Sequence, residues 1–214
     1  MGKARLEAFT DGVIAIIITI MVLEMKVPSG ADLAALAASA PVFSAYVLSY
    51  INVGIFWLNH HHMMHATGHI DGRVLWANLA LLFWLSLVPF MIRWIDEAGF
   101  APLPTAAYGV VLAMAGISYR LMQTAIIARN GRDSAPALAI GNDVKGNLSL
   151  ALYLVSVPLA FFDPRISIAL YIVVAAMWFV PDRRIESKVK WPRMPAGMCC
   201  TQNACHCPRK RAIQ

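Results

Sequence analysis

Six apolar segments recur along the chain, and most are about as long as a helix that crosses a bilayer. They run approximately over residues 9–25, 41–60, 74–95, 105–128, 147–162 and 166–181. Hydrophobic residues make up 59% of the chain and charged residues 14%, whereas soluble domains carry about 25% charged residues. The sequence therefore predicts an all-α membrane protein with six transmembrane helices. It predicts neither an enzyme nor a partner made of nucleic acid.

The Lys and Arg residues are unevenly divided between the two sets of turns that join these segments. With the N-terminus inside, the inside set is Lys3, Arg5, Arg73, Arg129, Arg132, Lys145 and the basic residues after Pro181, while the outside set is Lys26, Arg93 and Arg165. Cytoplasmic loops of membrane proteins carry an excess of Lys and Arg. Both termini are therefore predicted to be cytoplasmic, in a multi-pass protein of the plasma membrane.

The chain divides into residues 1–183, which hold all six segments, and a basic tail of residues 184–214. The tail carries the four cysteines of the chain, Cys199, Cys200, Cys205 and Cys207. It has no apolar period and is predicted to be a disordered cytoplasmic extension with free thiols. A zinc site formed by these cysteines and His206 is the less favoured alternative, because the spacing is not that of paired CxxC motifs.

The first segment raises a problem of length. Its apolar part, Gly12 to Leu23, covers about 18 Å as a helix, short of the roughly 30 Å that a bilayer core requires. A helix that begins before Asp11, with Arg5 in the cytoplasmic interface, restores a length of about 20 residues. Asp11 then lies at the membrane boundary, where a carboxylate needs a partner. The candidates at that depth are the His60–His65 group, Trp76 and Asn78.

The same helix has apolar residues on every face, so it is predicted to be buried all round and to suit the centre of an assembly. Ile16, Thr19, Ile20 and Leu23 fall in one narrow stripe on a helical wheel. Thr19 is the only polar side chain in that stripe. Ordinary helix packing explains such spacing as well as a functional surface does, and the spacing alone does not separate the two.

Several motifs together resemble the transmembrane-protein-175 family of potassium channels. Arg5-x-x-x-Phe9-Thr10-Asp11 is similar to the first-helix signature Arg-x-x-x-Phe-Ser-Asp, with Thr10 keeping the hydroxyl of the family's serine. Three further matches follow it, in Trp57-x-x-His60-His61, in Asn78 and in the pair Pro89-Phe90. The resemblance covers about residues 4–183.

The resemblance implies a homotetramer in the lipid bilayer, with the four first helices lining a central pore for potassium ions and with no cofactor or metal. Apolar rings of Ile16 and Leu23 would then form the gate, and Thr19 and Ile20 would lie beside them. A modestly selective, leak-type channel follows, because few fixed oxygens line such a pore. A packing cluster at the cytoplasmic side is implied for Arg5, Phe9, Thr10, Asp11, His60, His61 and Asn78.

Two charged residues keep alternative roles. A ring of Glu24 could concentrate cations at the outer mouth of the pore, or Glu24 could be a plain interfacial anchor. Arg120 lies deep in the fourth segment, where an arginine needs a partner such as Asp143 or Glu24.

Two other classes of protein remain open. A secondary, proton-coupled transporter could use Asp11, Arg120 and the His60–His65 group as a relay. A membrane haem or metal protein built on the histidines is less favoured, and interfacial hydrogen bonding is the preferred role for them.

Overall fold

The computed structural model describes residues 2–28, 30–131, 133–141 and 143–179, and every regular element in this part of the chain is an α-helix. In chain order these helices are α1 (Lys3–Leu23), α2 (Leu33–Ala38), α3 (Ala40–Ala66), α4 (Gly72–Ser86), α5 (Val88–Glu97), α6 (Pro102–Asn130), α7 (Ala135–Ile140), α8 (Val144–Leu159) and α9 (Pro164–Phe179). The prediction of an all-α membrane fold is confirmed. The predicted tail, residues 184–214, lies outside the described residues.

Four stretches are long and apolar enough to cross a membrane by length and composition: α1, α3, α6 and the combined Gly72–Glu97. The first helix begins at Lys3 and has 21 residues, so it covers about 31 Å and needs the residues before Asp11 to do so. Helices α8 and α9 are apolar but have 16 residues each. Each of these two helices therefore covers about 24 Å.

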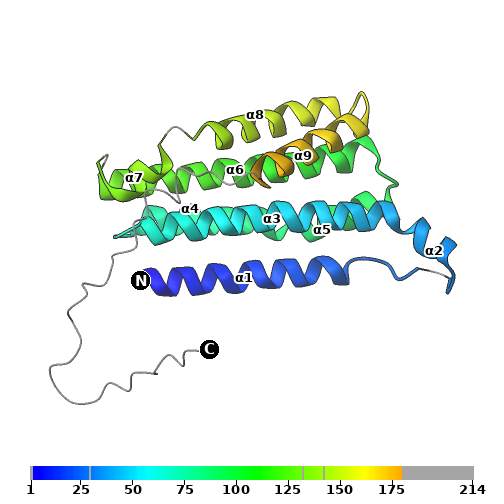
Figure 1. Cartoon of the computed structure of the whole chain (residues 1–214), viewed down its shortest axis with the longest axis horizontal. Coiled ribbons are helices and arrows are strands. Elements are labelled where there is room, and N and C mark those ends of the chain that lie inside the picture. The colour runs from blue at the N-terminus through cyan, green and yellow to red at the C-terminus, as the bar shows by residue number, and fades with distance from the viewer. Residues whose placement is uncertain (1, 29, 132, 142, 180–214) are drawn as a thin grey trace, which may run out of the picture.

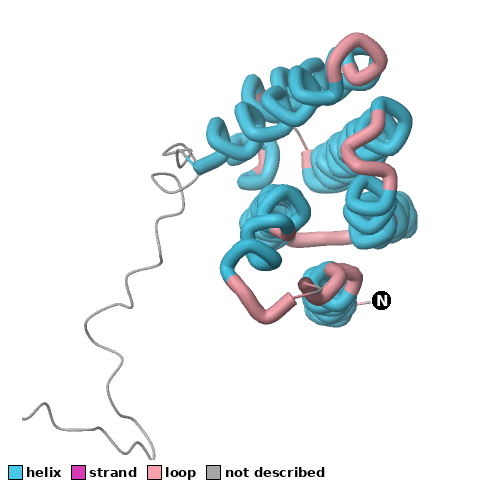
Figure 2. The backbone as a smooth tube through the Cα atoms, turned by 90° about the vertical axis from the view of Figure 1, so that its right-hand side faces the viewer, coloured by secondary structure: helices cyan, strands magenta, loops and turns pink. Residues whose placement is uncertain are grey.

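The chain runs back and forth along one axis (Figure 1), so that successive apolar helices lie antiparallel. The N-terminus, the α3–α4 connection and the α6–α8 connection share one end of the bundle. We call this the inner end, and the end with the α1–α2, α5–α6 and α8–α9 connections the outer end. Helix α1 lies at the edge of the bundle, next to α3, α4 and α5, and Figure 2 shows the same arrangement viewed from the outer end.

The third predicted segment is divided in two at Leu87. Pro89 has no N–H to donate to the carbonyl of Leu85, and its ring crowds that carbonyl. The backbone responds with a tighter turn, in which Leu87 N–H donates to the Trp84 carbonyl at 3.2 Å. Helix α5 therefore starts as a separate element, and its direction is not dictated by α4.

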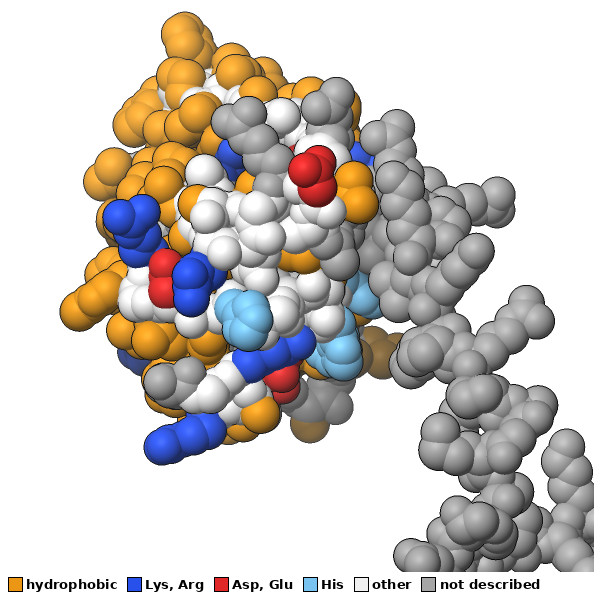
Figure 3. Space-filling model, turned by 90° about the vertical axis from the view of Figure 1, so that its left-hand side faces the viewer, with side chains coloured by type: hydrophobic (Ala, Val, Ile, Leu, Met, Phe, Trp, Pro, Cys, Tyr) orange, Lys and Arg blue, Asp and Glu red, His pale blue; other side chains and the backbone are white. Residues whose placement is uncertain are grey.

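Charged side chains gather at the two ends of the bundle, while its flanks are apolar. Figure 3 shows the inner end, where Lys, Arg and His side chains cluster beside a surface of hydrophobic residues. The described basic residues of the segments at this end are Lys3, Arg5, Arg73, Arg129 and Lys145, and those at the outer end are Lys26, Arg93 and Arg165. The apolar band between the two ends is what a bilayer requires.

Inside the bundle, polar side chains join helices in pairs. Ser49 and Tyr108 hydroxyls lie 2.9 Å apart, linking α3 to α6, and the Tyr153 hydroxyl donates to Asn52 Oδ1 at 3.1 Å, linking α8 to α3. The Tyr171 hydroxyl donates to the Thr105 carbonyl at 3.0 Å. Such bonds hold helices together where lipid offers no hydrophobic driving force between them. They fix the frame against which α1 packs.

Candidate functional site

Helix α1 contacts its own chain through one face only. Its buried side chains follow at intervals of three or four residues, which places them on one side of the helix. They are Leu6, Thr10, Ile14, Ile17 and Met21. The prediction that this helix is buried all round is therefore wrong for a single chain, because the rest of its surface lies open at the edge of the bundle.

The open side of α1 carries the stripe that the sequence analysis singled out. Ile16 is 58% exposed and Leu23 is 79% exposed, and Thr19 and Ile20 are also exposed. The hydroxyl of Thr19 donates to the carbonyl of Ile16 at 2.9 Å. Its hydrogen is therefore engaged, and the oxygen keeps lone pairs that can accept a contact from outside the helix.

At the inner end, a chain of three buried polar side chains joins α1, α4 and α3. The Asn78 amide donates to Thr10 Oγ1 at 2.9 Å, and Asn78 Oδ1 lies 3.0 Å from His60 Nε2. Because the carboxamide oxygen can only accept, Nε2 of His60 carries the hydrogen in this contact. Thr10, His60 and Asn78 are all at most 1% exposed. The hydroxyl of Thr10 is therefore a direct part of this network.

Asp11, next along the helix, has a different partner from those expected. Its Oδ1 accepts a hydrogen bond of 2.8 Å from the indole N–H of Trp57 on α3. The ring of Trp57 stacks on His61, with centroids 5.6 Å apart, and His61 lies against His65 at 4.4 Å. Expecting Asp11 to pair with the His60–His65 group, Trp76 or Asn78 was therefore wrong. Trp57 lies one helical turn before His60 and reaches the carboxylate first.

The other two residues of the first-helix signature lie on the surface of the chain. Arg5 and Phe9 are exposed, and within the described residues Arg5 has no ion pair or side-chain hydrogen bond. The inner end of α1 is held instead by Lys3, whose ammonium group donates to the Thr67 carbonyl at 3.0 Å and lies 4.0 Å from Glu7.

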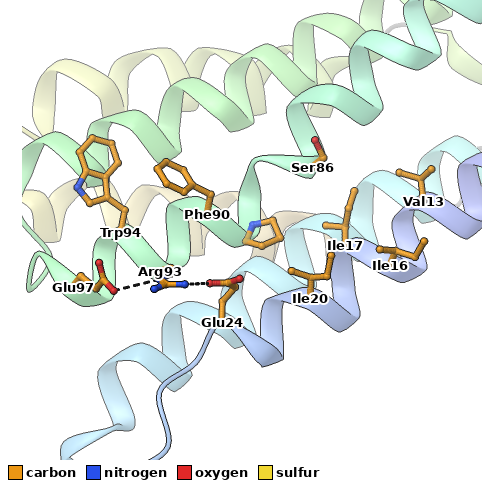
Figure 4. Close-up of a pocket in the computed structure, with 11 residues that line it drawn as sticks. Val13, Ile16, Ile17, Ile20, Glu24, Ser86, Phe90, Arg93, Trp94 and Glu97 are labelled. Carbon is orange, nitrogen blue, oxygen red and sulfur yellow. Dashed lines mark hydrogen bonds and ion pairs between the residues drawn. The ribbon is translucent and has the colours of Figure 1, made fainter.

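At the outer end, four charged side chains form an alternating chain between α1 and α5. Arg93 Nη1 lies 3.0 Å from Glu24 Oε2, and Arg93 Nε lies 3.3 Å from Glu97 Oε1 (Figure 4). Lys26 lies 3.6 Å from the same oxygen of Glu97. The Glu24 carboxylate is thus turned toward α5 and matched by a cation. This pairing reduces the field that Glu24 could offer to a permeating cation.

An apolar groove of about 850 Å³ lies between α1 and α5, with Glu24, Arg93 and Glu97 of this charge network among its lining residues. Figure 4 shows its walls, which include Ile16 and Ile20 from α1 and Phe90 and Trp94 from α5. The groove therefore continues the open stripe of α1 around the helix toward α5.

Arg120 does not have the partners expected for it. Glu24 is bound to Arg93, and Asp143 accepts from the Gln123 amide at 3.1 Å and from the Gly146 N–H at 2.9 Å. Arg120 and Asp143 both line a small cavity of about 50 Å³ between α3, α6 and α8. Over the described ranges no ion pair within 4.0 Å joins them. Nor do three or more His, Cys, Asp or Glu side chains in those ranges converge as a metal site.

Sequence reasoning missed two functional contacts, those of Trp57 and Arg93. The contact of Trp57 could have been found from the depth of each residue along its helix, because Asp11 and Trp57 each lie about 12–14 Å from the inner end of their helix. Arg93 gave no such signal. Its contact with Glu24 depends on how α5 packs against the end of α1, and hydropathy does not give that packing.

The comparisons with known proteins agree with this geometry. The sequence model of the family described as endosomal/lysosomal potassium channel TMEM175 matches residues 5–89. This chain is 47% identical over 190 residues to a potassium channel of Chryseobacterium sp. (strain P1-3), covering 89% of this chain and 99% of that protein. It is 30% identical over 186 residues to a potassium channel of Streptomyces collinus, covering 81% and 89% of the two chains.

A solved structure has the same fold. The crystal structure of a lysosomal potassium-selective channel TMEM175 homolog from Chamaesiphon minutus superimposes with a TM-score of 0.69 at 28% identity. The likeness covers 82% of this chain and 95% of that one. With its first-helix motif, its helical fold and relatives that match along almost their whole length, this chain belongs to the TMEM175 family of membrane channels.

Proposed function

We propose that this chain is a potassium channel in which the first helices of four copies line a central pore. The observation that carries the proposal is the open stripe of Ile16, Thr19 and Leu23 on a helix whose opposite face is packed against its own bundle. The choice of potassium as the permeant ion rests on the relatives named above as potassium channels. In this proposal α8 and α9 also cross the plasma membrane, giving six crossings with both termini in the cytoplasm.

In the proposed assembly, the apolar stripes of four chains face one another. Ile16, Thr19, Ile20 and Leu23 are exposed along the outer half of α1, which lies at the edge of the bundle where another subunit could approach it. Around a four-fold axis, Ile16 and Leu23 of four chains would each form an apolar ring. A ring narrow enough to dewet blocks ions, and a slight widening lets a partly hydrated ion pass.

Thr19 supplies the polar contact in such a pore. Its hydroxyl hydrogen is held by the Ile16 carbonyl, so the oxygens of four Thr19 side chains would face a passing cation as acceptors. Four hydroxyl oxygens replace only part of a hydration shell, which suits modest selectivity for potassium. Ile20 borders the stripe on the side of the α5 groove.

The residues that a proton-coupled transporter was expected to use as a relay do not form connected contacts among the described residues. Asp11 is bound to Trp57, and in the described ranges Arg120 makes no ion pair that would link it to Asp11 or to the histidines. A proton relay needs groups in contact or joined by water, and no observation favours such a chain of contacts here.

Flux into liposomes tests the proposal. Purified protein in potassium-loaded liposomes should release potassium down its gradient, with protein-free liposomes as the control. Flux should not require a second ion and should show no counterflow when unlabelled potassium is placed on the opposite side. Counterflow, or strict dependence on a proton gradient, would identify a carrier and reject the channel.

A further inference from the structure

We infer that Arg93 is a positioning residue for the pore: it fixes the outer end of α1 and, through it, the outer apolar ring at Leu23. The inference rests on the proposed function, because it takes α1 to be the pore helix. Arg93 contacts neither the ion nor the pore axis. Its effect passes through Glu24, the residue that follows Leu23 and ends α1.

Arg93 is the central member of the charge network at the outer end. It binds a carboxylate of the α1 terminus on one side, at 3.0 Å, and a carboxylate of its own helix on the other, at 3.3 Å. Lys26 contacts only the second of these carboxylates, Glu97. Arg93 is therefore the cation in this network that touches α1 itself, whereas Lys26 lies in the connection that follows and contacts Glu97.

Directional contacts hold α1 at its two ends and not between them. At the inner end Thr10 and Asp11 are hydrogen-bonded to α4 and α3, and at the outer end Glu24 is bound to α5. Over the intervening residues, about 20 Å of helix, the one side-chain hydrogen bond within the described part of the chain is that of Thr19 to its own helix. Apolar contacts are non-directional, so the rotation of the helix is set by its ends.

The groove beside α1 gives the helix somewhere to move. It is about 850 Å³ in volume and lies between α1 and α5, with Glu24 and Arg93 at its outer rim. When Arg93 loses its charge, the last turn of α1 is free to tilt into this space. The side chain of Leu23 then leaves its position in the ring. The inner ring at Ile16 lies two turns away and stays closer to the inner contacts.

Stability and permeation should respond differently to the loss of Arg93. Exposed ion pairs contribute little to stability, and Arg93 and Glu97 have about half of their side chains exposed. A residue that only stabilised the fold would therefore leave a folded mutant with normal selectivity. A positioning residue changes selectivity in a protein of nearly normal melting temperature.

The test measures the potassium-to-sodium permeability ratio in liposomes for wild type, Arg93→Gln, Lys26→Gln and the exchange Glu24→Arg with Arg93→Glu. In the Arg93→Gln protein, the permeability ratio should decrease by a factor of about two to five, the size expected from the coupling of one exposed ion pair. The Lys26→Gln control removes a neighbouring positive charge but keeps the Glu24–Arg93 contact, so its ratio should match wild type. The exchange restores the contact with reversed charges and should return the ratio toward wild type.

Each outcome decides the matter. The inference is overturned if folded Arg93→Gln has the permeability ratio of wild type. It is also overturned if the ratio of the exchange protein is no closer to wild type than the ratio of Arg93→Gln. If Arg93→Gln does not fold, the exchange protein carries the test alone, and a ratio altered as much as twofold contradicts the inference. Absence of potassium flux in wild type rejects the proposed function itself, whereas normal wild-type flux with unaffected Arg93 variants rejects only this step.

Discussion

The inner end of α1 is held by side chains whose donors and acceptors lie at one depth. Thr10, Asn78 and His60 each lie about 9–11 Å from the inner end of their helices, and they form one buried chain. That Asn78 and His60 lie in a network near this end of α1 could be predicted from the family resemblance of their motifs. The partner of Asp11 could not, because histidines, Trp76 and Asn78 were all within a turn of the right level and only packing selects Trp57.

Asn78→Leu tests the buried chain. The substitution keeps the volume but leaves Thr10 Oγ1 and His60 Nε2 without their partner, and a buried unsatisfied group costs about 1–3 kcal/mol. We expect a lower melting temperature in detergent. Asn147→Leu, on an exposed position of α8, is the matched control and should melt near wild type. Equal melting temperatures of the two variants would show that the hydrogen bonds of Asn78 to Thr10 and His60 contribute nothing to stability.

Trp57→Phe tests the contact of Asp11. Phenylalanine keeps an aromatic ring beside His61 but is smaller and lacks the indole N–H, so the hydrogen bond to Asp11 is lost together with some packing. A double-mutant cycle isolates the hydrogen bond. A double-mutant cycle with Asp11→Asn should give a coupling of about 0.5–1.5 kcal/mol in unfolding free energy. Additive effects of the two substitutions would mean that the 2.8 Å contact has no energetic role.

At the scale of elements, hydrophobic pattern predicts where most helices lie and misses how they begin, break and end. The first helix needed Arg5 and its neighbours to reach a spanning length, and it does begin at Lys3. The third segment looked like one helix, although Pro89 was visible in it. The consequence of a proline depends on whether the preceding turn can tighten, as it does here at Leu87, and hydropathy carries no such information. The connecting helices α2 and α7 were also missed, since six residues give too little periodicity.

Pro89→Ala tests whether the break at Leu87 directs α5. Alanine restores the missing N–H and favours one continuous helix, which would turn Arg93 away from Glu24. We expect the potassium-to-sodium permeability ratio to fall as it does in Arg93→Gln. Pro158→Ala, at a proline inside α8, is the control and should leave the ratio unchanged. A normal permeability ratio in Pro89→Ala would show that the break at Leu87 does not determine the position of Arg93.

At the scale of the whole molecule, a single chain leaves one apolar surface of α1 uncovered at the edge of the bundle. The stripe on α1 lies open, and the expectation that this helix is buried all round can hold only in an assembly. Sequence spacing found the stripe, but it could not say which face of α1 its own bundle would cover. That depends on the packing of Ile14, Ile17 and Met21 against the neighbouring helices.

The number of copies is a direct prediction of the account. Four chains of 23.5 kDa have a protein mass of about 94 kDa, which native mass spectrometry in mild detergent can measure. A four-fold assembly also permits closed cyclic symmetry with one kind of interface. A protein that stays monomeric or dimeric in lipid nanodiscs, while still conducting potassium, would contradict a pore on the central axis.

The most direct measurement is potassium flux through liposomes holding wild type, Ile16→Asn, Leu23→Asn or Val22→Asn. Val22 is a control on the same helix, also exposed but turned about 100–120° away from Leu23 and Ile16. We predict that a polar ring at Ile16 or Leu23 wets the constriction, raising flux or lowering potassium selectivity, while Val22→Asn behaves as wild type. If folded Ile16→Asn and Leu23→Asn conduct and select as wild type does, α1 is packing and does not line the pore.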